Sequence, residues 1–187
     1  MAVWLELANG QYQVIGSRLG NTGWSAPVRL DTAVAPATAI NQDTEVPGVS
    51  VAIDTNGNAA VTWTQKETSN GRANVYARTC AAIAALTACA APVTLESAAE
   101  NASWTRVASA PNGDFWAIWK QENAAFEQNV YASRYSSDGG QWGSRELLGG
   151  VHLGNNNKAE IAVDGQGRAT VVWSDLNDNR LYFTRYE

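Results

Sequence analysis

The feature that most constrains the fold is a segment that recurs along the chain. Three stretches, VSVAIDTNGNAAVTW, RVASAPNGDFWAIW and EIAVDGQGRATVVW, align on a closing tryptophan, and a shortened copy, MAVW, opens the sequence. The closing tryptophans are Trp4, Trp63, Trp119 and Trp173, which recur about every 55 residues. Self-similarity at a nearly fixed period predicts an array of similar structural units that stack on one another.

Each copy predicts two strands joined by a tight turn. The dipeptides Asn56-Gly57 and Asn112-Gly113 are typical of a two-residue type I′ hairpin turn, because both residues tolerate positive φ. Apolar residues also predict a third strand in every unit and a fourth strand in three units. The third strands are expected at 13–19, 74–80, 129–135 and 180–186, and the fourth strands at 26–30, 91–95 and 144–148.

Four short antiparallel strands per repeat are typical of the blade of a β-propeller. We therefore predict an all-β fold, a β-propeller of four-stranded antiparallel blades, with about four blades forming half or most of a ring. The chain would be one propeller domain (1–187) or a fragment of one. Its units are expected at about 1–31 (partial), 47–96, 103–148 and 158–187 (partial). The repeated Ala52, Ala108 and Ala162 would lie on the innermost strands, and the repeated tryptophans would fill the space between blades.

One loop carries a family resemblance. The segment SSDGGQW, residues 136–142, resembles the Asp-box (bacterial neuraminidase repeat) of sialidase-like propellers, whose pattern S-x-D-x-G-x-x-W is one residue longer. The residues that match the box are Ser136, Asp138, Gly140 and Trp142. The resemblance covers most of the chain through the repeats, whereas the box is clear only once. It implies a structural turn in which Asp138 caps backbone N–H groups and Trp142 packs beneath them.

Composition argues against several classes of function. The formal charge is −5 and no cluster of Lys or Arg occurs, which disfavours nucleic acid as a partner. One histidine (His152) and two cysteines cannot supply the three or four ligands of a His/Cys zinc site. No apolar stretch approaches the roughly 20 residues that span a bilayer. We therefore expect no metal, no cofactor, no nucleic acid and no membrane insertion.

The two cysteines, Cys80 and Cys89, lie in one loop between a third and a fourth strand. They are expected to form a disulfide, with two buried free thiols as the alternative. A disulfide would indicate a secreted or cell-envelope protein, in the periplasm or on the cell surface. The opening residues do not have the pattern of a signal peptide, so this expectation depends on the cysteine pair.

Three sets of polar residues recur at fixed repeat positions. Asp54 and Asp164 are interpreted as side chains that bind their own turns, with calcium ligation as the alternative. The residues two positions after the repeated tryptophans are expected to satisfy buried donors, or else to line a ligand site. Three arginines are expected to form inter-blade ion pairs rather than a substrate clamp. The residues two positions after the tryptophans are Glu6, Gln65, Gln121 and Asp175, and the arginines are Arg18, Arg134 and Arg185.

The remaining tryptophans are candidates for ligand binding, with ordinary packing as the alternative. Trp24, Trp104, Trp116 and Trp142, together with Arg106, are the candidate ligand-binding residues. Rim tryptophans beside polar groups suit sugars, which stack on the indole and hydrogen-bond to its neighbours.

We therefore expect a non-catalytic extracellular module that binds a carbohydrate or a surface protein through loops on one propeller face. A sialidase-type glycoside hydrolase and a structural or assembly module are the alternatives. The Arg-Ile-Pro motif of sialidases is absent from the sequence, so we do not expect an enzyme. The open ring would be completed by a second copy, as a homodimer, or by further repeats of a longer parent chain.

Overall fold

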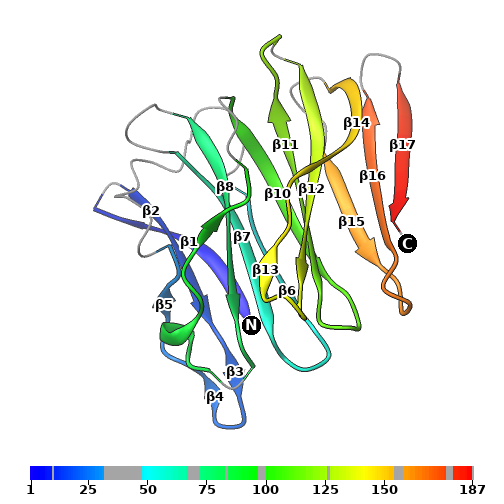
Figure 1. The fold of residues 1–187 in the computed structure, drawn as a ribbon. Helices are drawn as coiled ribbons and strands as arrows, with labels where there is room; N and C mark the ends of the chain where they lie inside the picture. Colours follow the sequence, from blue (N-terminus) through cyan, green and yellow to red (C-terminus); the bar gives the residue numbers. More distant parts are fainter. Residues whose placement is uncertain are drawn as a thin grey trace.

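The fold is built from antiparallel β-sheets that lie side by side in chain order (Figure 1). The computed structural model describes residues 1–9, 11–31, 48–66, 72–82, 84–96, 100–125, 127–153, 158–175 and 179–186. The predicted all-β class is confirmed. Within the described residues the one helical element is a single 3₁₀ turn, η1 (Leu86–Ala88), so no helix there is long enough to cross a membrane.

The sheets are named here by the repeat that contains them, as units one to four. Unit one contains β1 (Ala2–Ala8), β2 (Gln11–Ser17) and β5 (Val28–Arg29), with a separate hairpin of β3 (Leu19–Gly20) and β4 (Gly23–Trp24). Unit two contains β6 (Val49–Ile53), β7 (Ala59–Lys66), β8 (Ala73–Cys80) and β9 (Val93–Thr94). The third sheet is formed by β10 (Ala102–Ser109), β11 (Phe115–Glu122), β12 (Gln128–Ser136), β13 (Gln141–Trp142) and β14 (Glu146–Leu153). Unit four contains β15 (Ala159–Val163), β16 (Ala169–Asp175) and β17 (Arg180–Tyr186).

The turns between the first and second strands differ from the predicted type I′ geometry. Gly57 donates its N–H to the Asp54 carbonyl, and Asp54 donates to the Asn58 carbonyl, which closes a three-residue loop. Gly57 has a φ of 83°, whereas Asn56 is not among the described non-glycine residues with positive φ. The loop is therefore a type I turn followed by a left-handed glycine. The turns that end in Gly113 and Gly167 repeat this pattern.

A stacked tryptophan–tyrosine pair recurs in units two to four. Each repeated tryptophan on the second strand lies opposite a tyrosine on the third strand, because the two residues are register partners. The pairs are Trp63–Tyr76, Trp119–Tyr131 and Trp173–Tyr182, with ring centroids 5.9, 6.2 and 6.2 Å apart and interplanar angles of 18°, 19° and 18°. In unit one the partner of Trp4 is Ile15. The repeat in sequence therefore reflects a repeated packing unit.

The units pack through two different sheet faces. One face carries the tryptophan and is called the tryptophan face; the other carries small apolar residues of the third strand and is called the small-residue face. Val75 and Ala77 on the small-residue face of unit two pack into one cluster with Ala117 and Trp119 on the tryptophan face of unit three. Units one and two, and units three and four, meet in the same way. The core is thus divided among successive interfaces between units.

The predicted disulfide between Cys80 and Cys89 is confirmed. It closes the loop that leaves β8, and both cysteines belong to the apolar cluster between units one and two, together with Leu86. Arg78 binds the same region, because its guanidinium donates to the carbonyls of Cys89 and Ala90. The loop is therefore part of the packed structure rather than a projecting insertion.

We predict that Trp119→Ala lowers the free energy of unfolding by about 3–5 kcal/mol, because the indole is fully buried between two units. Trp24→Ala is the matched control and should change it by less than about 0.5 kcal/mol, because Trp24 is exposed. Urea denaturation of both variants measures the difference. Equal losses for the two variants would contradict the assignment of Trp119 to the core.

We also predict that the double variant Cys80→Ser/Cys89→Ser is less stable by about 2–3 kcal/mol, since the short closed loop gains conformational freedom in the unfolded chain. Reduction of the wild type should lower its thermal midpoint and should leave the double variant unaffected. A reductant-sensitive midpoint in the double variant would show that the sensitivity has another source.

Candidate functional site

The first strands of units two to four bring different residues to the same repeat positions. Counted from the repeated alanine, one position holds Gly48, Trp104 and Lys158, and the next position on the same face holds Ser50, Arg106 and Glu160. Four of these side chains meet between β10 and β15. We call Trp104, Arg106, Lys158 and Glu160 the inner-strand cluster. It contains two of the predicted ligand-binding residues, Trp104 and Arg106.

The inner-strand cluster is built around the Trp104 indole. The Arg106 guanidinium carbon lies 4.1 Å from the ring centroid and the Lys158 ammonium nitrogen lies 4.7 Å from it. Arg106 Nε is 3.3 Å from both carboxylate oxygens of Glu160. Trp104 Nε1 donates to the Ala159 carbonyl at 3.3 Å. Two cations therefore lie over one aromatic ring, and an acidic side chain neutralises one of them.

Trp104 lies on a β-bulge, and its backbone is strained. The pairing of β10 with β11 shifts register between Ser103 and Arg106, and Trp104 has a φ of 52°. A bulky residue rarely adopts this left-handed conformation, which costs on the order of 1–3 kcal/mol. Bulges redirect side chains and are common beside functional sites. The bulge directs the Trp104 indole toward β15 of the next unit, where Ala159 accepts its hydrogen bond.

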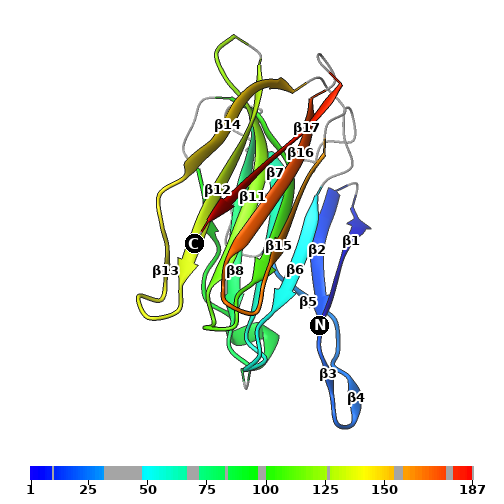
Figure 2. The same cartoon turned by 90° about the vertical axis from the view of Figure 1, so that its right-hand side faces the viewer.

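Trp24 has the most exposed indole of the predicted ligand-binding residues. It lies on the β3–β4 hairpin, which projects at the end of the molecule where the β6–β7 turn also lies (Figure 1 and Figure 2). Its side chain is 57% exposed. It lines a groove of about 420 Å³ between this hairpin and the loop around Leu86, with Arg18 and Thr87 also in the lining. An indole face is therefore open to solvent at this groove.

Trp116 and Trp142 are packing residues in this structure. Trp116 is 8% exposed, and its ring lies 5.1 Å from that of Tyr186 in unit four. Trp142 stacks at a tilt on Tyr135, with centroids 5.6 Å apart, and joins the clusters between units two and three. One side of Trp142 borders a cavity of about 240 Å³. Both indoles therefore offer a ligand less surface than Trp24 does.

The Asp-box-like loop has a different arrangement from the one expected for Asp138. Within the described part of the chain the Asp138 carboxylate makes no hydrogen bond or ion pair. The Gly139 N–H is bound by the Ser136 hydroxyl instead, and Gly140, with a φ of 64°, donates to the Ser136 carbonyl. Trp142 packs beneath the loop as expected. The geometry therefore does not show an Asp-box.

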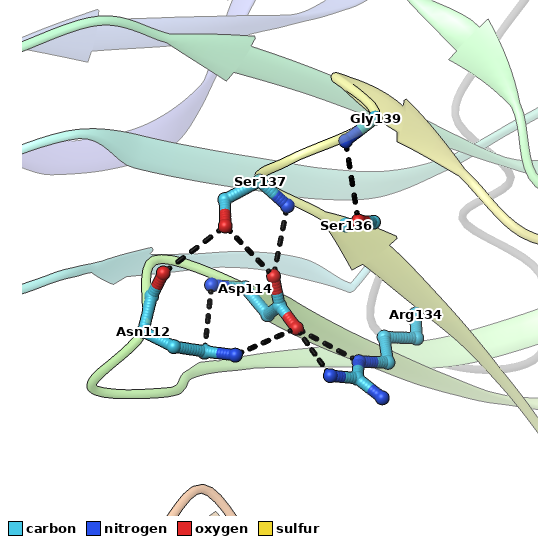
Figure 3. Close-up of polar contacts among 6 residues, drawn as sticks. All are labelled: Asn112, Asp114, Arg134, Ser136, Ser137 and Gly139. Atoms are coloured by element: carbon cyan, nitrogen blue, oxygen red, sulfur yellow. Dashed lines mark hydrogen bonds and ion pairs between the residues drawn. The ribbon is translucent and has the colours of Figure 1, made fainter.

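Asp114 supplies the carboxylate that holds this loop, and the sequence reasoning missed it (Figure 3). Its Oδ1 accepts from the Ser137 N–H at 2.8 Å and from the Ser137 hydroxyl at 3.0 Å. Its Oδ2 accepts from Arg134 Nε at 2.9 Å and from Asn112 Nδ2 at 3.0 Å. In unit two, Asn58 stands at the same repeat position and accepts from the Ala82 N–H at 3.0 Å. The first turn of a unit thus anchors the loop after its third strand.

The expected role of Asp54 and Asp164 in their own turns is confirmed. Asp54 Oδ1 accepts from the N–H groups of Asn56 and Asn58, and Asp164 Oδ1 accepts from those of Gln166 and Arg168. The Arg168 guanidinium hydrogen-bonds to Asp164 and lowers the pKa of this carboxyl to about 2. Among the described residues no group of three or more His, Cys, Asp or Glu could hold a metal ion.

The repeated arginines do not form the expected inter-unit ion pairs. Arg134 pairs with Asp114 and Arg185 with Asp164, in each case inside one unit. The reason is that the first-turn carboxylates lie beside the end of the third strand of the same sheet. Arg18 does reach the next unit, but it donates to the carbonyls of Ala81 and Ala82.

The glutamines two residues after the repeated tryptophans satisfy buried donors, which was the expected role rather than the alternative of lining a ligand site. Gln65 Oε1 accepts from Trp63 Nε1 at 2.9 Å, and Gln121 Oε1 accepts from Trp119 Nε1 at 3.1 Å. Gln121 also donates to the carboxylate of Glu96 in the preceding unit. Both glutamines are buried, so they hold the packing together and do not line an open site.

The fold resembles that of a solved sialidase. The chain aligns over 94% of its length with the structure titled Hadza microbial sialidase Hz136, with a TM-score of 0.59 and 11% sequence identity. It spans 38% of the length of that protein. The endo-arabinase from Bacteroides thetaiotaomicron VPI-5482 aligns with 98% of the chain and 73% of its own, at a TM-score of 0.45 and 16% identity. No protein-family model and no curated protein matches the chain. At this identity the likeness to the sialidase concerns the fold alone.

We predict that Asp114→Asn destabilises the protein by about 2 kcal/mol at neutral pH, because it removes the charge that binds Arg134 and Ser137. Partial burial alone would raise the pKa of Asp114, but hydrogen bonds from Ser137, Arg134 and Asn112 outweigh it and hold the pKa below its usual value. The stabilisation is therefore complete above about pH 4, the pKa of this carboxyl in the unfolded chain. It is lost as the pH falls through the lower pKa of Asp114 in the folded protein.

Urea denaturation at pH 7 and at several pH values below about 4 measures this effect. Asp138→Asn is the matched control, since Asp138 lies in the adjacent loop and is exposed. It should change neither the stability nor its dependence on acid. An Asp114→Asn protein with the stability and the acid sensitivity of the wild type would contradict the role given to Asp114.

Proposed function

We propose that the four units are part of a β-propeller with a sialidase-like fold, and that this module recognises carbohydrate without cleaving it. The antiparallel units of three to five strands, the stacking of their faces and the likeness to a sialidase fold support the propeller. The disulfide is consistent with an extracellular protein, so we further propose that the module is secreted or held in the cell envelope.

The inner-strand cluster is the observation on which the binding proposal depends. Trp104 adopts a strained conformation, and Arg106 and Lys158 lie over its ring. Strain of this kind persists only where the surrounding structure enforces it, and it is frequent at ligand-binding sites. An indole with charged hydrogen-bonding groups beside it matches the mixed apolar and polar surface of a sugar. This surface lies on the first strands, which in a propeller surround the central channel.

The charges of the cluster favour an acidic carbohydrate. Arg106 is paired with Glu160, whereas Lys158 is exposed and forms no ion pair with the described residues. The cluster thus has a local excess of one positive charge in a chain whose formal charge is −5. A ligand with a carboxylate or sulfate group gains an ion pair with Lys158 that a neutral sugar does not.

A glycoside hydrolase is the second candidate, favoured by the likeness to a sialidase fold. Most glycosidases use two carboxyl groups that flank the scissile bond. The inner-strand cluster contributes Glu160, whose carboxylate is held by Arg106. A fluorogenic sialoside assay separates the candidates, because measurable turnover would replace the recognition proposal with hydrolysis.

We predict that Trp104→Gly weakens binding of acidic glycans at least tenfold on a glycan array and in titration calorimetry. Glycine tolerates the left-handed backbone of this position, so the variant should remain folded while it loses the aromatic surface. Lys158→Ala should reduce binding of acidic glycans more than that of neutral ones.

Trp24→Ala is the control, because it removes an exposed indole of the β3–β4 hairpin, outside the inner-strand cluster. It should leave the affinity unchanged. Loss of binding on Trp24→Ala with full binding by Trp104→Gly would move the site to the groove beside Trp24. No binding by the wild type to any glycan on the array would overturn the carbohydrate proposal.

A further inference from the structure

None of the described residues covers the small-residue face of unit four, which carries the two most exposed large apolar side chains that the structure describes. Leu181 and Phe183 on β17 are 76% and 74% exposed, and Val172 on β16 is 39% exposed. All three side chains lie on one face, because Val172 and Phe183 are register partners and Leu181 lies two residues before Phe183. Three neighbouring large apolar side chains at this exposure are typical of an interaction surface.

The repeat defines what covers this face in the other units. Leu181 and Phe183 stand at the positions of Val130 and Ala132 in unit three, which are 0% and 1% exposed. Val130 and Ala132 are covered by the tryptophan face of the following unit, through Val171 and Trp173. Units one and two cover their small-residue faces in the same manner. The surface of unit four therefore fits a tryptophan face.

Unit one carries the tryptophan face that no other described unit covers. Trp4 is only partly buried, whereas Trp63, Trp119 and Trp173 are 0%, 0% and 4% exposed. The register partner of Trp4 is Ile15, which is buried. The described units thus present both halves of the same kind of interface, one on unit four and one on unit one.

The side-chain sizes of these two faces are complementary. On the small-residue face, unit four has the large Phe183 where unit three has Ala132 and unit two has Ala77. On the tryptophan face, unit one has the smaller Ile15 where the other units have a tyrosine. Extra volume on one face is therefore matched by reduced volume on the other, as close packing requires. This match favours another copy of the same chain over an unrelated partner.

We propose that two copies of this chain form a closed ring, in which unit four of each copy packs on unit one of the other. The ring has two identical contacts related by a two-fold axis, the commonest symmetry of protein dimers. Four units from each copy give eight, within the range of closed propellers. Phe183 and Leu181 of one copy then pack against the partly exposed Trp4 of the partner. This proposal does not require a carbohydrate ligand.

Sedimentation velocity and light scattering at micromolar concentrations test the proposal. The wild type should have a mass of about 40 kDa, twice the 20.0 kDa of one chain. Phe183→Ser should sediment at the mass of one chain, because it places a hydroxyl in the apolar contact. Leu147→Ser is the matched control, since Leu147 is also exposed, at 54%, but lies on β14 of unit three. It should keep the wild-type mass.

A second variant tests the other half of the contact. Ala2→Glu places a charge on the tryptophan face of unit one and should also give single chains. Mixed with Phe183→Ser, it should restore a two-chain species, because one intact contact of the two remains. A wild type that sediments as one chain overturns the proposal and indicates that a further unit of a longer chain covers the face. A species larger than two copies, or a Phe183→Ser protein that keeps the wild-type mass, also overturns it.

Discussion

The stacked pair of tryptophan and tyrosine on adjacent strands is the interaction on which the rest of the structure depends. In units two to four it places a large flat surface on one sheet face, with ring centroids about 6 Å apart. That surface needs small residues opposite it, which Val75 and Ala77 provide for Trp119. The fold is therefore a chain of asymmetric contacts, each between one aromatic face and one face of small side chains.

Burial of the indole has a polar consequence as well. A buried N–H must find an acceptor, and Gln65 and Gln121 supply it from the same face, two residues along the strand. In unit four the corresponding residue is Asp175, whose side chain is one methylene shorter. Within the described residues, Trp173 Nε1 has no hydrogen-bond partner. The repeated tryptophan of unit four thus lacks the acceptor that Gln65 and Gln121 supply in units two and three.

The sequence predicted those parts of the fold that are specified many times over. The four units and their strand order follow from the repeated tryptophans, because every copy supports the others. The prediction of type I′ turns was wrong. It rested on the dipeptide Asn56-Gly57 alone, whereas the loop in the structure contains three residues. The Asp54 carboxylate binds the N–H groups of Asn56 and Asn58, and this favours the longer loop. In unit three, where Ala110 replaces the aspartate, the Asn112 amide oxygen accepts from the Asp114 N–H instead, so side-chain capping accompanies the longer loop in both units.

Two features of the candidate site, the role of Asp114 and the bulge at Trp104, were not predicted from the sequence, for different reasons. Asp114 left a signal: Ala110 stands where units two and four have an aspartate, and Asp114 pairs with Arg134 as Asp164 pairs with Arg185 in unit four. The bulge at Trp104 left none, because no residue there favours a positive φ. Its conformation follows from contacts with Ala159, Arg106 and Lys158, which tertiary packing brings together.

The repeat also separates the positions that packing fixes from those that are free to change. The repeated tryptophans must fit a neighbouring unit that carries the same pattern, so a change in one unit requires a change in the next. The starts of the first strands have no such partner, and they hold Gly48, Trp104 and Lys158 at one position. Units that are alike in their packing therefore differ where their first strands meet. A row of similar units can form one specific site in this way, since the contacts that stabilise the row do not depend on the residues that line the site.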